Sequence, residues 1–313
     1  METPPPSEPS EEHESADADN GPGEAHADVF ARWGSGPLLL FAFGCLLLYE
    51  IWIAVLWNRD SELGVWGLAL APLLGVLLPV ALVIRTTRVP VREQLWLYGL
   101  SRAQWIGVML AATGAVPVCY AAGALNAAWT PPDPEYYELF QALAPSDFPS
   151  AIAGFVAVVI CVPLGEEILF RFLLLGVLAR HVHAVAAVVA AGVLFAAAHA
   201  APFVLLPIGI LGIVLGLLTV WSRTLTAAWI GHAVFNLFGY IELCVTGDAE
   251  TTAVEEFVLK PWVLVMGTLM LVVGLALLRT HALASVERDD LRQSRAQTDT
   301  HAHDDPPTAR DDT

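Results

Sequence analysis

Residues 165–172 read GEEILFRF and place Glu166, Glu167 and Arg171 inside a long run of apolar residues. The run extends from Ser150 to Arg180, and a continuous helix of that length would measure about 46 Å at roughly 1.5 Å per residue. Each charged side chain at the centre of a bilayer costs about 2.5–3.5 kcal/mol on insertion scales. The stretch therefore predicts a membrane helix whose charges are compensated by partners.

The composition of the rest of the chain also indicates an integral membrane protein. Of the 313 residues, 56% are hydrophobic and 15% are charged, a profile that excludes an ordinary soluble domain. The formal net charge of −17 comes mainly from the two ends of the chain. Residues 1–30 and 281–313 are rich in acidic and small polar residues, so they are predicted to be disordered.

Eight hydrophobic runs are predicted to form membrane spans, because a bilayer core of about 30 Å takes about 20 helical residues. They lie at 37–57, 63–85, 103–123, 150–180, 184–200, 203–221, 224–245 and 257–279. The predicted fold class is all-α, a polytopic transmembrane helix bundle with disordered acidic termini. With both ends in the cytoplasm, twelve Lys or Arg residues lie on the cytoplasmic side and two on the other, as the positive-inside rule requires.

The chain is divided into five segments on this interpretation. They are an acidic tail at 1–30, accessory membrane helices and an interfacial loop at 31–149, a helical core at 150–245, a final membrane helix at 246–280, and a C-terminal tail at 281–313. The loop at 124–149 fits either a lid over a site or an ordinary interfacial loop. The expected location is the bacterial cytoplasmic membrane.

Two local signals predict how the helices bend and pack. Pro163 and Gly165 stand just before the glutamates and predict a kink there, with a cavity near residue 165. Gly212 and Gly216 are four residues apart and predict a face on which another helix packs closely.

The polar residues of the core suggest a site. Glu167 and Arg171 are four residues apart, in the favourable order for an ion pair on one helix, which leaves Glu166 without a local partner. Other spans offer His199, His232 and Asn236. Taken singly, each has a structural explanation, since a histidine near a span end often bonds a carbonyl and a membrane Asn often joins helices. Taken together, they predict a functional cluster.

Two kinds of chemistry fit this cluster. A carboxylate and imidazoles in a water-accessible cavity can deprotonate a water and stabilise an oxyanion, which is what peptide-bond hydrolysis requires. Alternatively, Glu166, His199 and His232 would ligate Zn²⁺ and leave one position open for water. The residue types alone leave both possibilities open.

The order of three motifs resembles the CPBP family of intramembrane proteases, which includes type II CAAX prenyl endopeptidases and bacteriocin-processing or immunity proteins. The motifs are Glu166-Glu167-x-x-x-Arg171, Phe195-x-x-x-His199 and His232-x-x-x-Asn236. The resemblance implies that Glu166 and His199 activate the attacking water and that His232 and Asn236 stabilise the oxyanion. It assigns Glu167 and Arg171 to structural support of the site.

The resemblance also implies an endopeptidase that acts on a membrane-associated protein or peptide, possibly a CAAX-type prenylated one. We favour a metal-free mechanism over one that uses Zn. The expected partners are this substrate and the lipid bilayer, with no nucleic acid. A transporter with a buried polar site and a non-catalytic scaffold or immunity-type protein are the alternative interpretations.

Overall fold

The structure is a computed structural model that describes residues 33–57, 63–86, 95–246 and 253–304. Within these ranges the regular structure is entirely helical. Seven of the described helices are long and apolar enough to cross a membrane, and α11 (Ala184–Ala198) is a shorter apolar helix. The predicted polytopic helical bundle is confirmed. The tail predicted at 1–30 lies outside the described residues.

The first half of the chain forms helices up to the GEEILFRF stretch. In order they are α2 (Ser35–Leu56), α3 (Val65–Pro72), the π-helical segment η1 (Leu73–Leu77), α4 (Leu78–Ile84), α6 (Arg102–Trp129) and α7 (Pro134–Gln141). A long helical run follows, made of α8 (Phe148–Gly154), η2 (Phe155–Cys161), α9 (Val162–Glu167), η3 (Ile168–Leu175) and α10 (Gly176–Leu178). Part of the loop predicted at 124–149 is therefore helical.

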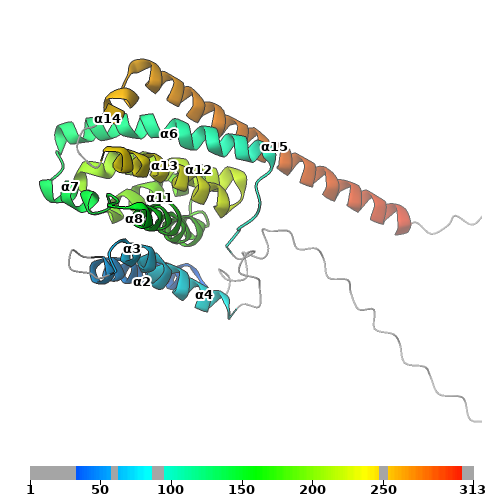
Figure 1. Ribbon diagram of the computed structural model, residues 1–313. Helices are drawn as coiled ribbons and strands as arrows, with labels where there is room; N and C mark the ends of the chain where they lie inside the picture. Colours follow the sequence, from blue (N-terminus) through cyan, green and yellow to red (C-terminus); the bar gives the residue numbers. More distant parts are fainter. Residues whose placement is uncertain (1–32, 58–62, 87–94, 247–252, 305–313) are drawn as a thin grey trace, which may run out of the picture.

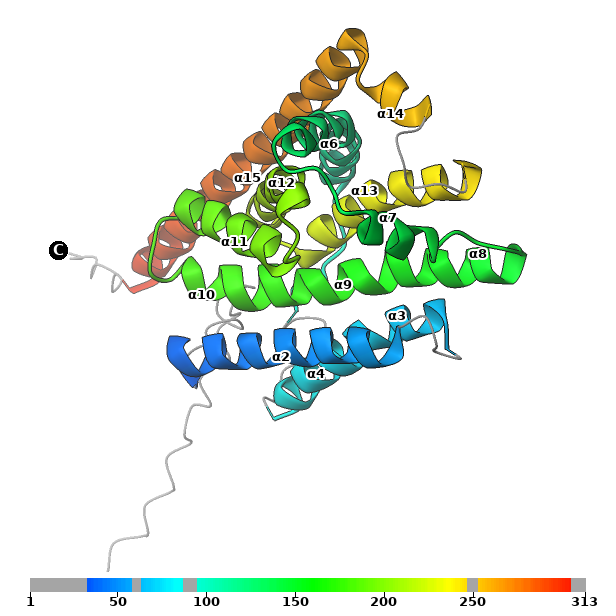
Figure 2. The same ribbon diagram turned by 90° about the vertical axis from the view of Figure 1, so that its left-hand side faces the viewer.

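The second half continues from α11 through the short 3-10 helix η4 (Pro202–Val204) to α12 (Leu205–Ser222) and α13 (Leu225–Thr246). It ends with α14 (Ala253–Val258) and α15 (Pro261–Asp304). Figures 1 and 2 show that the run from α8 to α10 is central. The layer of α2, α3 and α4 lies on one side of it, and α11, α12 and α13 lie on the other. Helices α6 and α15 form the far side of the bundle.

The central run keeps its helical course through the predicted kink. Two π-helical segments, η2 and η3, flank the α-helical turns that carry Glu166 and Glu167, and such segments are frequent at functional sites. Gly165 packs against α3 on one side, and the cavity predicted near residue 165 stays a prediction. A Cβ added to Gly165 would lie 2.5 Å from Cβ of Pro72. Only glycine permits this approach directly before the glutamates.

Hydrogen bonds at Asp147 fix where the central run begins. Asp147 accepts from the backbone N–H of Ser150, 2.8 Å away, and the side chain of Ser150 caps in return. This capping box satisfies two backbone N–H groups at the N-terminal end of the helix. The side-chain and backbone hydrogen bonds from Ser150 lower the pKa of Asp147 below its ordinary value.

The predicted glycine face of α12 packs closely, as expected. A Cβ on Gly212 would lie 2.9 Å from Cα of Gly192 in α11, and a Cβ on Gly216 would lie 2.9 Å from Val188. The backbones of α11 and α12 therefore meet directly, which is typical of small residues at membrane helix interfaces.

The structure gives a helix in the described part of the tail from residue 281 onward, and the predicted disorder of this tail stays a prediction. Helix α15 continues through it to Asp304, whereas its membrane-compatible part ends at Val286. The added segment contains Arg, Gln and Ala, which favour helix, as well as four Asp, and it extends a helix that has already nucleated. Residues 305–313 lie outside the described part.

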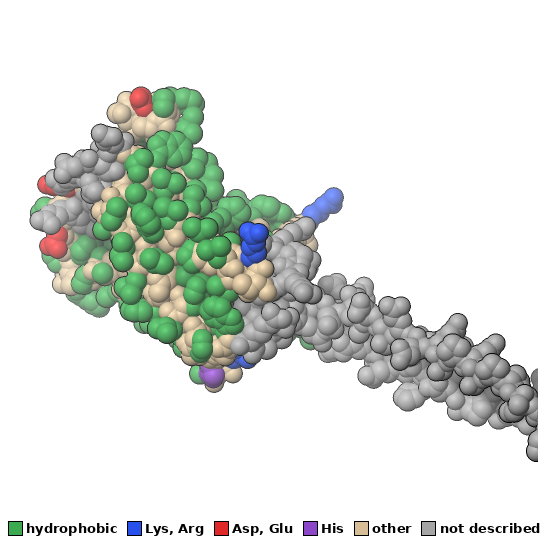
Figure 3. Space-filling model, turned by 90° about the horizontal axis from the view of Figure 1, so that it is seen from below, with side chains coloured by type: hydrophobic (Ala, Val, Ile, Leu, Met, Phe, Trp, Pro, Cys, Tyr) green, Lys and Arg blue, Asp and Glu red, His purple; other side chains and the backbone are tan. Residues whose placement is uncertain are grey.

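The surface of the bundle is apolar where lipid would cover it. Figure 3 shows hydrophobic side chains over most of one face, with acidic side chains near one end and basic ones near the other. Large hydrophobic residues such as Leu40, Phe43 and Trp105 are exposed. A continuous apolar belt of this kind is expected of an integral membrane protein.

Candidate active site

Glu167 is the centre of a buried ionic network. Its Oε2 lies 3.0 Å from Nε of Arg171, and both side chains are fully buried, so the ion pair predicted from their spacing is confirmed. The two atoms attract by charge but do not have the angles of a hydrogen bond. Arg171 uses Nη2 instead to donate to the carbonyl of Gly212, 3.3 Å away. The network thus joins the central run to α12.

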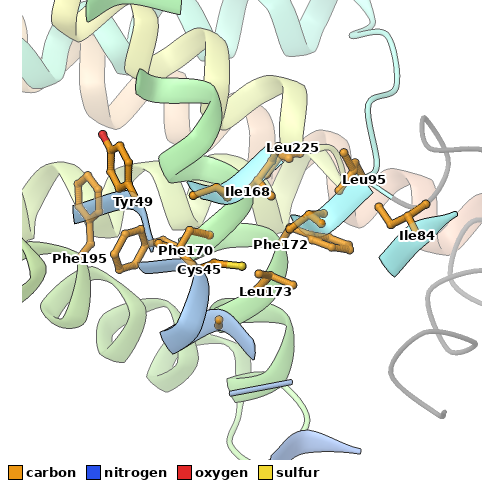
Figure 4. Close-up of a cluster of buried hydrophobic side chains, with 14 of the residues drawn as sticks. Cys45, Tyr49, Ile84, Leu95, Ile168, Phe170, Phe172, Leu173, Phe195 and Leu225 are labelled. Atoms are coloured by element: carbon orange, nitrogen blue, oxygen red, sulfur yellow. The ribbon is translucent and has the colours of Figure 1, made fainter. Parts of the chain in front are cut away.

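Phe195, the first residue of the second motif, is packed among the polar groups. The guanidinium of Arg171 lies 4.5 Å from the centre of its ring, a cation–π contact. The rings of His199 and His232 meet the Phe195 ring edge-on, at centroid distances of 5.0 and 5.8 Å. Figure 4 shows Phe195 beside Phe170 and Tyr49 in a cluster of buried hydrophobic side chains.

His232 connects the two glutamates. Its Nδ1 lies 2.8 Å from Oε1 of Glu167 and its Nε2 lies 3.8 Å from Oε2 of Glu166. A carboxylate only accepts hydrogen bonds, so Nδ1 of His232 is the nitrogen that carries a hydrogen. Nε2 then faces Glu166, able to accept a proton in the neutral ring or to donate one in the imidazolium.

Glu166 differs from its neighbour in surroundings and accessibility. Its residue exposure is 9%, against 0% for Glu167. The hydroxyl of Tyr49 in α2 donates to its Oε1 across 3.4 Å. The structure thus supplies two neighbours for Glu166, Tyr49 and His232, from helices far away in the sequence.

His199 stands at the C-terminal end of α11 and joins the cluster through Phe195. Its Nδ1 donates to the carbonyl of Phe195, 2.9 Å away, which leaves the lone pair on Nε2. Its side chain is among the exposed ones in the described protein. Among the described residues, no hydrogen bond or ion pair joins His199 directly to Glu166.

Asn236 lies one helical turn beyond His232 on α13. Its Nδ2 donates to the carbonyl of Val158 in η2 across 2.9 Å. An amide nitrogen carries two hydrogens, so one remains for another acceptor. The structure therefore unites Glu166, Glu167, Arg171 and His232 in one network, with His199 attached through Phe195 and Asn236 adjacent on α13.

Comparison with known proteins found one family model that matches part of the chain. Residues 148–238 match the model of the type II CAAX prenyl endopeptidase Rce1-like proteins. This segment is similar to an Rce1-like domain, and it covers less than half of the chain. The predicted resemblance to CPBP-family intramembrane proteases is confirmed. No curated protein and no solved structure matches the chain.

The Rce1-like domain contains all three motifs, but side chains outside it complete the cluster. Tyr49 contacts Glu166, and its neighbour Glu50 interacts electrostatically with Glu166 and His199. Sequence reasoning missed both residues. A signal was present, because Glu50 is the one charged residue in the span predicted at 37–57, and a charge in a span indicates function or a partner.

Asn126 of α6 is a further residue that sequence reasoning missed. Its side chain donates to the carbonyl of Pro202, 3.0 Å away, and accepts from the N–H of Leu206, 2.8 Å away. These bonds tie α6 to the turn that follows His199, where Ala200 has a left-handed backbone with φ of 50°. Asn126 thus fixes the segment that ends the second motif.

The predicted Zn²⁺ alternative requires Glu166, His199 and His232 to surround one point. Within the described ranges, no group of three or more His, Cys, Asp or Glu side chains is arranged to hold a metal ion. Glu166 and His232 approach each other, whereas His199 makes its contacts with Phe195. The three candidate ligands do not fit a common metal in this conformation.

An apolar cavity of about 180 Å³ lies between η2 and α13, on the same seam as the Asn236–Val158 hydrogen bond. Its lining residues are all hydrophobic: Val159, Ile160, Trp229, Ile230, Ala233, Val234 and Leu237. Trp229 also donates from Nε1 to the carbonyl of Ile160, 3.1 Å away. The cavity offers an apolar surface next to the polar cluster.

Proposed function

We propose that the chain is an intramembrane endopeptidase that hydrolyses a peptide bond of a membrane-associated protein or peptide, using a water activated by Glu166 and His199. The observation that carries the proposal is the buried Glu167–Arg171–His232 network, which directs Nε2 of His232 toward Glu166 within an Rce1-like domain. Burying three ionisable groups between two membrane helices costs free energy. An arrangement that bears this cost indicates a functional site.

The proposed reaction begins with proton transfer from water. Two groups are suited to take that proton. One is the partly accessible carboxylate of Glu166, and the other is His199, whose Nε2 carries a lone pair. The water oxygen bonds to the peptide carbonyl carbon, and the carbonyl electrons move onto its oxygen. The C–N bond then breaks, and the proton passes to the leaving nitrogen.

The oxyanion formed in this step requires donors. We assign this role to His232, which donates from Nε2 in its imidazolium form, and to the second amide hydrogen of Asn236. Glu167 holds the His232 ring through Nδ1, 2.8 Å away, and so keeps Nε2 on the side of Glu166. Glu167 and Arg171 then act as structural support, without contact to the substrate.

The substrate proposal follows from the apolar cavity and the domain family. A hydrophobic segment or a prenyl chain would find apolar contacts in the cavity beside Asn236, and a CAAX-type prenylated protein is the candidate that the family suggests. We also propose that both termini are cytoplasmic, on the basis of the excess of Arg and Lys on that side, and that the membrane is bacterial.

Cleavage by the purified protein in liposomes tests the proposal. The substrates are a fluorogenic CAAX-type peptide and a panel of membrane peptides, each offered to wild type, Glu166→Ala and His199→Ala with and without chelator. Matched controls are Glu256→Ala and His281→Ala, which remove the same residue types outside the domain. We expect turnover by wild type and controls, loss in both site variants, and no effect of chelator.

Other outcomes separate the alternatives. Loss of turnover with chelator and recovery with Zn²⁺ would move Glu166, His199 and His232 to metal ligation. Equal rates for wild type and both site variants, all folded, would contradict the roles of Glu166 and His199. No turnover by any folded variant on any substrate would favour the scaffold or transporter interpretation.

A further inference from the structure

We propose that Tyr49 of α2 is a positioning residue for Glu166, so that the working site extends beyond the Rce1-like domain onto the first described membrane helix. The inference rests on the proposed function for its catalytic meaning. Its structural basis is the contact between the Tyr49 hydroxyl and Oε1 of Glu166, 3.4 Å apart. Because Oε2 faces His232, Tyr49 fixes the carboxylate through the oxygen that His232 does not face.

The surroundings of Tyr49 explain why its hydroxyl matters. The side chain is 5% exposed and lies in the apolar cluster with Cys45, Phe170 and Phe195. Figure 4 shows the hydroxyl pointing away from the labelled apolar side chains. A buried hydroxyl is costly unless it is hydrogen bonded, and the Tyr49 hydroxyl donates its hydrogen bond to Glu166. A phenylalanine would fill the same space without it.

Close backbone packing fixes both sides of the contact. A Cβ on Gly75 of η1 would lie 2.6 Å from both N and Cα of Tyr49, so η1 presses directly on α2 at this residue. On the other side, Gly165 packs against Pro72 of α3 next to Glu166. The layer of α2, α3 and η1 is therefore held against the central run where the two side chains meet.

Glu50 follows Tyr49 on α2 and interacts electrostatically with both Glu166 and His199. The hydrogen bond from Tyr49 holds Oε1 of Glu166 in place beside this second carboxylate. The bond is long in this conformation, and hydrogen bonds at catalytic sites often shorten when substrate binds.

Infrared spectroscopy tests the contact without any need for turnover. The carboxylate bands of Glu166 are those lost from the spectrum of the full-length protein in Glu166→Gln. We expect Tyr49→Phe to shift these bands. The matched control is Tyr120→Phe, which removes a hydroxyl that donates to another membrane glutamate, Glu242, and should leave the Glu166 bands in place. Unshifted bands in Tyr49→Phe would overturn the inference.

Kinetics on a cleaved substrate test the positioning role. We expect kcat of Tyr49→Phe to fall about tenfold, with KM within about twofold of wild type, because one hydrogen bond to a reacting group is lost. Tyr240→Phe is the burial-matched control, since its hydroxyl donates to the carbonyl of Ala151 away from Glu166. Equal kcat values for the two variants would overturn the positioning role.

The two measurements distinguish a failure of the proposed function from a failure of the positioning inference. If wild type cleaves nothing, the proposed function fails, and the infrared bands still decide whether Tyr49 binds Glu166. If wild type cleaves but Tyr49→Phe retains its full kcat, the function stands and the positioning inference fails.

Discussion

Oε1 of Glu167 lies 2.8 Å from Nδ1 of His232, although 65 residues separate them in the chain. The contact gives two adjacent glutamates different surroundings. Glu167 is fully buried, paired with Arg171 and in contact with His232. Glu166 remains partly accessible, and among the described residues its nearest basic side chain is His232, with Nε2 at 3.8 Å. Adjacent carboxylates in one helix thus have different surroundings and, we propose, different roles.

Removing Glu167 should destabilise the protein strongly. Glu167→Ala leaves the Arg171 charge buried without its partner, a change that costs about 3–5 kcal/mol in comparable cases. Reversible unfolding in mixed micelles measures the loss. Glu167→Leu combined with Arg171→Leu should cost less than the two single variants together, because neither charge is left alone. An unfolding free energy equal to that of Glu256→Ala would contradict a structural role for the pair.

Removing either proposed oxyanion donor should lower kcat about 10²- to 10³-fold, with a smaller effect on KM. The variants are His232→Ala and Asn236→Ala, measured on the best substrate found. Asn236→Ala also releases the carbonyl of Val158, so its unfolding is measured in parallel. If Asn236→Ala loses stability but keeps the wild-type kcat, Asn236 only joins α13 to η2.

Asn126→Ala should loosen the turn that follows His199. It removes the bonds to Pro202 and Leu206 from a side chain that is 7% exposed, and each buried group left unsatisfied costs about 1–3 kcal/mol. We expect faster hydrogen exchange at the amide of Leu206 and a lower kcat. Thr130→Val, which removes only the neighbouring hydroxyl, is the control. Unchanged exchange at Leu206 would contradict this role.

Gly165→Ala should displace Glu166 by overpacking. The added Cβ would lie 2.5 Å from Cβ of Pro72, and overpacking of this kind costs about 1–3 kcal/mol. We expect lower stability and a lower kcat. Gly239→Ala is the matched control, because the added methyl meets no atom within 4 Å and alanine favours helix. A Gly165→Ala variant as stable and active as this control would show that the close contact is dispensable.

Part of the site could be predicted because it depends on local sequence. The pair of Glu167 and Arg171 follows from a spacing of four residues on one helix, and the spans follow from hydropathy. The partner of His232 could not be predicted, because it depends on how α13 is rotated against the central run. Nothing local indicates whether its Nδ1 meets Glu166 or Glu167.

Other features were missed for equally physical reasons. Tyr49 is an unremarkable aromatic residue in an apolar span until packing brings it to Glu166, and the motifs do not extend to α2. The kink predicted from Pro163 and Gly165 stays a prediction, and the run remains helical through both residues. Here Pro163 stands at the start of α9, where it needs no hydrogen-bond donor. Close packing on Pro72 holds the following turn.

Phe195 has a consequence for how protons move in the cluster. Both imidazoles meet its ring edge-on, and in the described part of the chain no hydrogen bond joins His199 to His232. An aromatic ring neither accepts nor passes a proton, so Phe195 offers no direct path between the two histidines. A proton that moves from His199 to His232 therefore has to pass through another group, and Glu166, which Nε2 of His232 faces, is the one that the cluster supplies.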